Sequence, residues 1–129
     1  MSNIPADLRF TASHEWIRDE GDGVVSIGIT DFAQAQLGDI VFVELPAAGT
    51  EVAAGDVVGV VESVKAASDV YAPISGRVEA SNGELETGPE RVNSDAYGAW
   101  FLRVRLADPA QLDGLLDPAG YAGLLPQGD

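Results

Sequence analysis

The chain has 129 residues, of which 21 are acidic and 7 are basic, so its formal net charge is −14 at pH 7. This charge opposes binding to nucleic-acid phosphates and to anionic membranes, and it favours partners with basic docking surfaces. The sequence has no cysteine and one histidine, which excludes disulfides, thiolate metal sites and multi-histidine metal sites.

The length predicts one domain over residues 1–129, with a core at about residues 8–106 and a C-terminal helical segment at about residues 108–125. The apolar stretches are too short to span a membrane. The start, Met1 to Asp7, has neither the apolar core of a signal peptide nor the arginine-rich character of a transit peptide. We therefore expect a cytoplasmic protein without a membrane partner, and we expect a monomer.

The predicted strands are short runs of β-branched and apolar residues between Gly, Pro and Asp turns, a pattern typical of a mostly β fold. They are Glu15–Arg18, Val24–Ile29, Ile40–Leu45, Val57–Glu62 and Trp100–Leu106, with Asp22-Gly23 as the turn between the first two. We expect Trp16, Phe42 and Trp100 to lie in the core.

One short helix is predicted between the second and third of these strands. Phe32 and Leu37 are apolar at helical spacing, Thr30 or Asp31 is able to cap the start, and Gly38 is able to cap the end. Two more short helices are predicted near the C-terminus, because aspartates 108 and 117 each precede a proline suited to a first helical position.

Lys65, the only lysine of the chain, lies in the most informative segment. A strand that ends near Ser63 and one that begins near Ala67 place it at an exposed hairpin tip beside small residues. Only a primary amine forms an amide, so arginine cannot replace lysine at a modified position. From spacing alone, a modified or reactive lysine and an ordinary solvated charge both remain open, because six arginines show that the chain prefers arginine in general.

Several separate motifs, in the right order, then identify a family. They are Glu62-Ser63-Val64-Lys65-Ala66 with Pro73-Ile74-Ser75-Gly76, Ser13-His14-Glu15-Trp16, Gly28 to Gln34, Leu37 to Pro46, and Val92 to Gly98. Together they resemble the glycine cleavage H-protein family over about residues 8 to 124, and the lysine motif resembles its lipoylation site. Ala96 stands where the family commonly has proline, and the approach to Trp100 is one residue shorter than usual.

The resemblance implies a barrel-sandwich hybrid with a short internal helix, short C-terminal helices and lipoate attached covalently to Lys65. It implies a non-catalytic carrier of glycine catabolism and one-carbon metabolism. The expected partners are the pyridoxal-phosphate glycine decarboxylase that loads an aminomethyl group, the tetrahydrofolate-dependent aminomethyltransferase that unloads it, dihydrolipoyl dehydrogenase, which reoxidises the carrier, and lipoate-attaching enzymes.

The resemblance also suggests roles for four polar residues near the lysine or in the first β segment. Glu62 is expected to help the attaching enzyme recognise the turn. Ser13, Glu15 and Asp69 match positions that could line a cleft sheltering the loaded arm, although ordinary solvated side chains would look the same. His14 could suggest a general base, but a lone histidine without a nucleophile is more often structural.

Three alternatives stay open on the sequence. An enzyme that uses Lys65 as a Schiff-base nucleophile would need a desolvated pocket rather than an exposed turn. A biotinyl domain typically has methionines beside its lysine, whereas Met1 is the only methionine here, and the lipoyl domain of a 2-oxo acid dehydrogenase lacks the extra helices. A scaffold that relays lipoyl groups to other proteins shares both fold and lysine.

Overall fold

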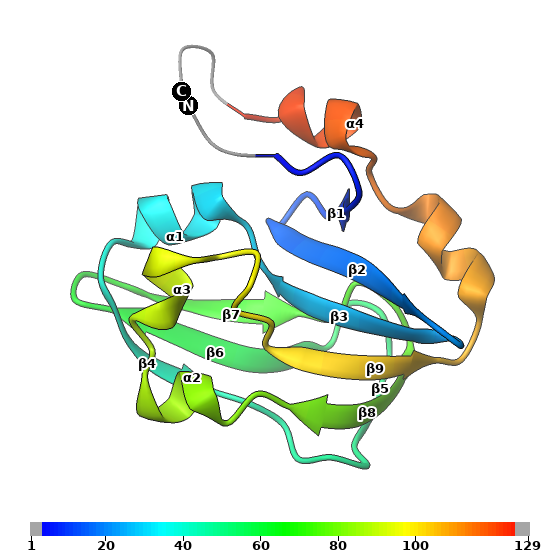
Figure 1. The fold of residues 1–129 in the computed structure, drawn as a ribbon, viewed down its shortest axis with the longest axis horizontal. Helices are drawn as coiled ribbons and strands as arrows, with labels where there is room; N and C mark the ends of the chain where they lie inside the picture. The colour runs from blue at the N-terminus through cyan, green and yellow to red at the C-terminus, as the bar shows by residue number, and fades with distance from the viewer. Residues whose placement is uncertain (1–3, 126–129) are drawn as a thin grey trace.

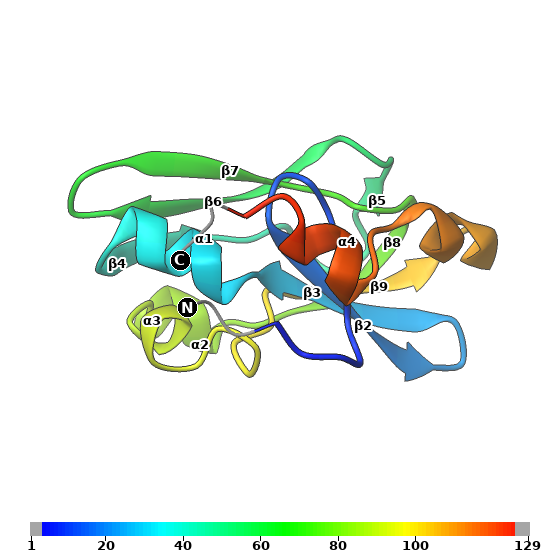
Figure 2. The same cartoon turned by 90° about the horizontal axis from the view of Figure 1, so that it is seen from above.

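The computed structural model describes residues 4–125, in which two antiparallel β-sheets face each other across a hydrophobic core (Figures 1 and 2). The six-stranded sheet has the order β1 (Arg9–Phe10), β2 (Glu15–Gly21), β3 (Val24–Ile29), β9 (Leu102–Leu106), β8 (Gly76–Ser81) and β5 (Glu51–Val52). The three-stranded sheet has the order β4 (Ile40–Glu44), β6 (Val57–Ser63) and β7 (Ala67–Tyr71). The mostly β prediction is confirmed.

β-branched residues from both sheets form the core. Val78 of β8 pairs with Val104 of β9, Val43 of β4 pairs with Val61 of β6, and all four side chains are buried. Branched side chains suit such pairs because they fit the pleated surface with little loss of rotamer freedom. The core therefore fixes the position of β6, the strand that leads to Lys65.

A second apolar cluster lies around Trp16 and joins the two ends of the described chain. It contains Leu8, Phe10, Trp16 and Tyr121, and the Trp16 indole N–H donates to the Ala96 carbonyl at 3.0 Å. Trp16 pairs with Gly28 across β2 and β3, and a Cβ on Gly28 would lie 2.6 Å from the indole ring. Glycine is therefore required at position 28 for the ring to lie flat against β3.

The predicted helices are confirmed together with their caps. α1 spans Asp31–Leu37, and the Thr30 hydroxyl accepts from the Ala33 N–H at 3.2 Å. Near the C-terminus a 3-10 helix spans Pro109–Gly114 and α4 spans Pro118–Ala122. Asp108 and Asp117 cap these two helices through their side chains, which satisfies N–H groups that have no partner within the helix.

The prediction that Phe42 lies in the core is wrong. Its side chain is 45% exposed, because β4 is an edge strand whose pairing with β6 is irregular between Ile40 and Phe42. Trp100 is only partly buried and lies under the Arg103 guanidinium, 4.1 Å from the ring centroid. The strand β9 begins at Leu102 rather than at Trp100.

Several short elements were not predicted. They are β1, β5, β8, α2 (Glu84–Thr87) and α3 (Arg91–Ser94). No helix within residues 4–125 is both long and apolar enough to cross a membrane.

Candidate functional site

Lys65 lies in a tight turn between β6 and β7, as its sequence context predicted. The Ser63 N–H donates to the Ala66 carbonyl at 2.7 Å, and the Ser63 hydroxyl oxygen accepts from the N–H groups of Ala66 at 3.1 Å and Lys65 at 3.3 Å. The turn protrudes at the end of the molecule where α1 and α3 lie (Figures 1 and 2). Ser63 therefore holds the turn in one shape while leaving it in solvent.

The Lys65 side chain is exposed, and its amine makes no ion pair or hydrogen bond with any residue in the described range 4–125. Val64 beside it is 70% exposed, and Ala66 and Ala67 add little bulk. A free primary amine on a firm turn is the arrangement needed to form an amide with a carboxylic acid, and no enclosing pocket is required. The residues present therefore fit a covalently attached lipoyl group.

Two acids flank the turn on the hairpin strands. Glu62 on β6 and Asp69 on β7 are both exposed. The ion pairs among the described residues are Arg91–Glu84 and Arg105–Glu79, which lie outside the hairpin. The hairpin thus presents carboxylates that are open to a cationic partner.

Glu15 is buried, which sequence reasoning did not foresee. Its side chain is 1% exposed and accepts hydrogen bonds from the Thr11 hydroxyl, from the Ser13 hydroxyl at 2.6 Å and from the Tyr71 N–H at 3.3 Å. The structure thus brings Ser13 and Glu15 together and joins them to the end of β7. Asp69 is on the same strand, two residues closer to Lys65, and is not part of this hydrogen-bonded group.

His14 lies next to this group and has a structural environment. Its Nδ1 is 2.8 Å from the Tyr121 hydroxyl, and its ring lies 4.9 Å from the Phe32 ring. Burial lowers the pKa of His14, and the negative charge of Glu15 opposes this effect. These contacts favour the structural interpretation of His14 over a general base.

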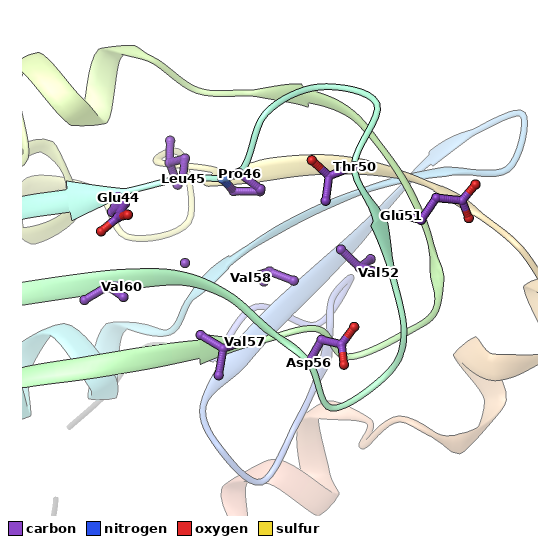
Figure 3. A pocket seen from close by; sticks show the side chains of 11 residues that line it. Glu44, Leu45, Pro46, Thr50, Glu51, Val52, Asp56, Val57, Val58 and Val60 are labelled. Carbon is purple, nitrogen blue, oxygen red and sulfur yellow. The ribbon is translucent and has the colours of Figure 1, made fainter.

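An open groove of about 510 Å³ lies elsewhere, between the end of β4, the strand β5 and the start of β6 (Figure 3). Its lining combines valines with the acids Glu44, Glu51 and Asp56. The groove and Lys65 are at opposite ends of β6, so none of the predicted site residues lines it. No group of His, Asp or Glu residues in the described range could hold a metal ion.

Asn93 and Gly38 also lie near the lysine turn, although the sequence suggested no site role for Asn93 and only a helix-capping role for Gly38. Asn93 hydrogen-bonds the Gly38 carbonyl at 2.9 Å, and Lys65 Cε lies 3.5 Å from where a Cβ on Gly38 would be. The motifs around both residues were visible signals, but spacing alone could not reveal this contact.

Comparison with known proteins gives a consistent result. A model described as "Glycine cleavage H-protein" matches residues 8–127. The chain is 60% identical to the glycine cleavage system H protein of Burkholderia ambifaria, covering 97% of this chain and 99% of the relative. It is 63% identical to that of Laribacter hongkongensis, covering 94% and 96%.

One solved structure extends the similarity to the fold. The crystal structure of a glycine cleavage system H protein from Mycobacterium marinum matches with a TM-score of 0.84 and 41% sequence identity, over 93% of this chain and 97% of that one. The lipoyl-domain-like barrel-sandwich arrangement expected from the motifs is thereby confirmed.

Proposed function

Since the chain belongs to the glycine cleavage H-protein family, and so is a non-catalytic lipoyl carrier of the glycine cleavage system, we propose that lipoate is attached to Lys65. The observation that supports this most is the only lysine of the chain, which is exposed on a turn braced by Ser63 and has no ion-pair partner among residues 4–125. When bound, lipoate supplies a cyclic disulfide that accepts a group on one sulfur while the other is reduced. The protein contributes position and recognition.

The attachment proposal is tested by intact-mass and peptide analysis of protein made with lipoate available. We expect one lipoyl adduct, on Lys65. Lys65→Arg should carry no adduct and should lose all carrier activity, yet unfold within about 0.5 kcal/mol of wild type because position 65 is an exposed turn. An adduct elsewhere, or an active Lys65→Arg protein, would contradict the proposal.

We further propose the specific carrier cycle. The lipoyl arm takes an aminomethyl group from the pyridoxal-phosphate glycine decarboxylase to the tetrahydrofolate-dependent aminomethyltransferase, and dihydrolipoyl dehydrogenase then reoxidises it. Reconstitution with the three purified enzymes tests the cycle by the tetrahydrofolate-dependent release of ammonia from glycine. A role in relaying lipoyl groups to other proteins is the second candidate, and a fall in lipoylation of other carriers after gene deletion would support it.

Glu62 is proposed as a recognition residue for the lipoate-attaching enzyme. It is exposed on β6, three residues before the lysine, and has no ion pair among the residues described. Glu62→Gln should slow attachment, whereas Glu86→Gln, a change of an exposed acid outside the hairpin, should not. Equal attachment rates in both variants would remove Glu62 from this role.

Ser13, Glu15 and Asp69 are proposed to shelter the loaded arm, whose aminomethyl group is cationic. Ser13 and Asp69 are exposed residues, and the buried Glu15 accepts from the Ser13 hydroxyl and from the Tyr71 N–H at the end of β7. A partly desolvated carboxylate attracts an ammonium more strongly than one in water.

Asp69→Asn is the cleaner test of the shelter because the residue is exposed, whereas Glu15→Gln also places an amide against the Tyr71 N–H. Both variants should remain lipoylated but release ammonia and formaldehyde faster in the absence of tetrahydrofolate. Unchanged lifetimes of the loaded form in both would eliminate the shelter and leave the carrier assignment intact.

A further inference from the structure

Asn93 clamps the corner where α1 gives way to β4. Its Oδ1 accepts from the Ile40 N–H at 2.8 Å, and its Nδ2 donates to the Gly38 carbonyl at 2.9 Å and to Gln34 Oε1 at 2.8 Å. A backbone N–H only donates and a backbone carbonyl only accepts, so these partners fix the orientation of the amide. No other side chain of similar size offers one acceptor and two donors in this arrangement.

The clamped corner supports the lysine turn directly. Asp39, between the two clamped residues, accepts through its carbonyl from the Val64 N–H at 3.1 Å. Among the described residues, this is the only backbone hydrogen bond that residues 64–66 make outside the hairpin. The Lys65 side chain also lies over Gly38, because its Cε is 3.5 Å from the position of a Cβ there.

We infer that Asn93 is a positioning residue for the carrier lysine. By fixing the corner at residues 38–40, it fixes the seat of the turn, meaning the hydrogen bond from the Val64 N–H to the Asp39 carbonyl. It thereby fixes the direction in which the Lys65 amine is presented. The inference rests on the proposed attachment of lipoate to Lys65. It gives a role to a motif that the attachment chemistry itself does not use.

Presentation of the amine affects attachment because the attaching enzyme must bring Lys65 Nζ against the carbonyl carbon of an activated lipoyl group. There the amine loses a proton and displaces the activating group, so that one amide bond forms as one acyl bond breaks. A displacement of about 1 Å at such a step costs up to about 100-fold in rate. A loosened corner should therefore slow attachment without unfolding the protein.

Asn93→Asp tests the inference with a side chain of nearly the same shape. The new carboxylate still accepts from Ile40 but faces the acceptor oxygens of Gly38 and Gln34. We expect kcat/KM for attachment by a purified lipoate ligase, with ATP and lipoate, to fall about tenfold. Amide hydrogen exchange of Val64 should accelerate by about tenfold or more, while the amides of Leu102 and Val104 keep their protection.

Asn82→Asp is the matched control. Asn82 also uses its amide as both donor and acceptor, with one donor bond fewer than Asn93: it donates to the Trp100 carbonyl at 2.9 Å and accepts from the Glu84 N–H at 3.2 Å, and it makes no bond to the corner or the turn. The variant removes a comparable donor hydrogen bond away from the lysine turn, so it should keep wild-type attachment and wild-type exchange at Val64. If Asn93→Asp does not fold, Gln34→Ala, which removes one acceptor of the clamp, should shift both readouts in the same direction.

Two results would overturn the inference. One is accelerated Val64 exchange with a wild-type attachment rate, which would mean that the seat does not control presentation. The other is unchanged Val64 exchange in a folded Asn93 variant, which would mean that Asn93 does not hold the seat. Wild-type protein that takes up no lipoate would instead refute the attachment proposal, and the exchange result would still stand.

Discussion

The turn around Lys65 and the corner around Glu15 satisfy their polar groups in opposite ways. The lysine turn is closed by its own Ser63 and leaves its charged side chains in solvent. The Glu15 corner is buried, and its partners come from the loop before β2, from β7 and, through His14, from α4. The proposed attachment site thus lies where substitutions cost little stability, whereas the proposed arm cleft includes Glu15, a charged group whose buried hydrogen bonds stabilise the fold.

The comparison predicts its largest effect for Glu15→Ala. The substitution leaves the Thr11 and Ser13 hydroxyls and the Tyr71 N–H without their shared acceptor, and we expect a loss of about 3 kcal/mol in the free energy of unfolding. Urea denaturation measures this loss. Asp69→Ala, which removes an exposed carboxylate, should stay within about 0.5 kcal/mol of wild type, and equal losses would break the contrast between the regions.

Tyr121→Phe should have a smaller effect. The hydroxyl lies 2.8 Å from His14 Nδ1 and 2.7 Å from the Thr30 hydroxyl, whereas the ring stacks on Phe10 with centroids 4.6 Å apart. Because phenylalanine keeps the stacking and loses only the buried hydrogen bonds, we expect about 1–2 kcal/mol of destabilisation. Tyr71→Phe at an exposed position is the control, and a Tyr121→Phe protein as stable as that control would show that the hydroxyl contributes nothing.

The mildest prediction concerns pH. Burial lowers the pKa of His14 in the folded protein, whereas the unfolded chain keeps the ordinary value of about 6.5. As the pH falls below that value the unfolded chain takes up the proton first, so stability falls until the pH passes the lower, folded pKa. The measurement is the change in Tm between pH 7.5 and pH 5.5.

His14→Asn isolates this effect because His14 is the only histidine. Asparagine tolerates the positive φ of 72° at this position, and its oxygen can replace Nδ1 as the partner of Tyr121. The variant should lose less Tm on acidification than wild type. Identical losses would assign the pH dependence to the carboxylates instead.

Much of the fold could be predicted from local signals. The caps at Thr30, Asp108 and Asp117 and the turn around Lys65 each depend on residues within a few positions, so the sequence displays them directly. The exposure of Phe42 could not be predicted, because an apolar residue gives the same sequence pattern on an edge strand as on a central strand. The two-residue strand β5 has its partner β8 about 25 residues away, and β1, although it pairs with the neighbouring β2, is too short to give a pattern of its own.

The candidate site also contains features that depend on adjacent residues and features that depend on distant ones. Lys65 and its hairpin were predicted from adjacent residues. The burial of Glu15 depends on Tyr71, 56 residues away, and the clamp at Asn93 depends on Ile40, 53 residues away. Neither contact has a local signature.

The place of β9 in its sheet has a consequence for how the chain acquires its structure during synthesis. β9 is the last strand in sequence among the described residues, yet it lies between β3 and β8. Until residues 102–106 leave the ribosome, the six-stranded sheet is divided into two separate groups of strands, and its closure must wait for a pairing between segments more than 70 residues apart. Such non-local pairing slows folding, whereas the β6–β7 hairpin closes across a few residues. The order of synthesis therefore allows the hairpin that carries the lysine turn to form early, whereas the six-stranded sheet can be completed only late.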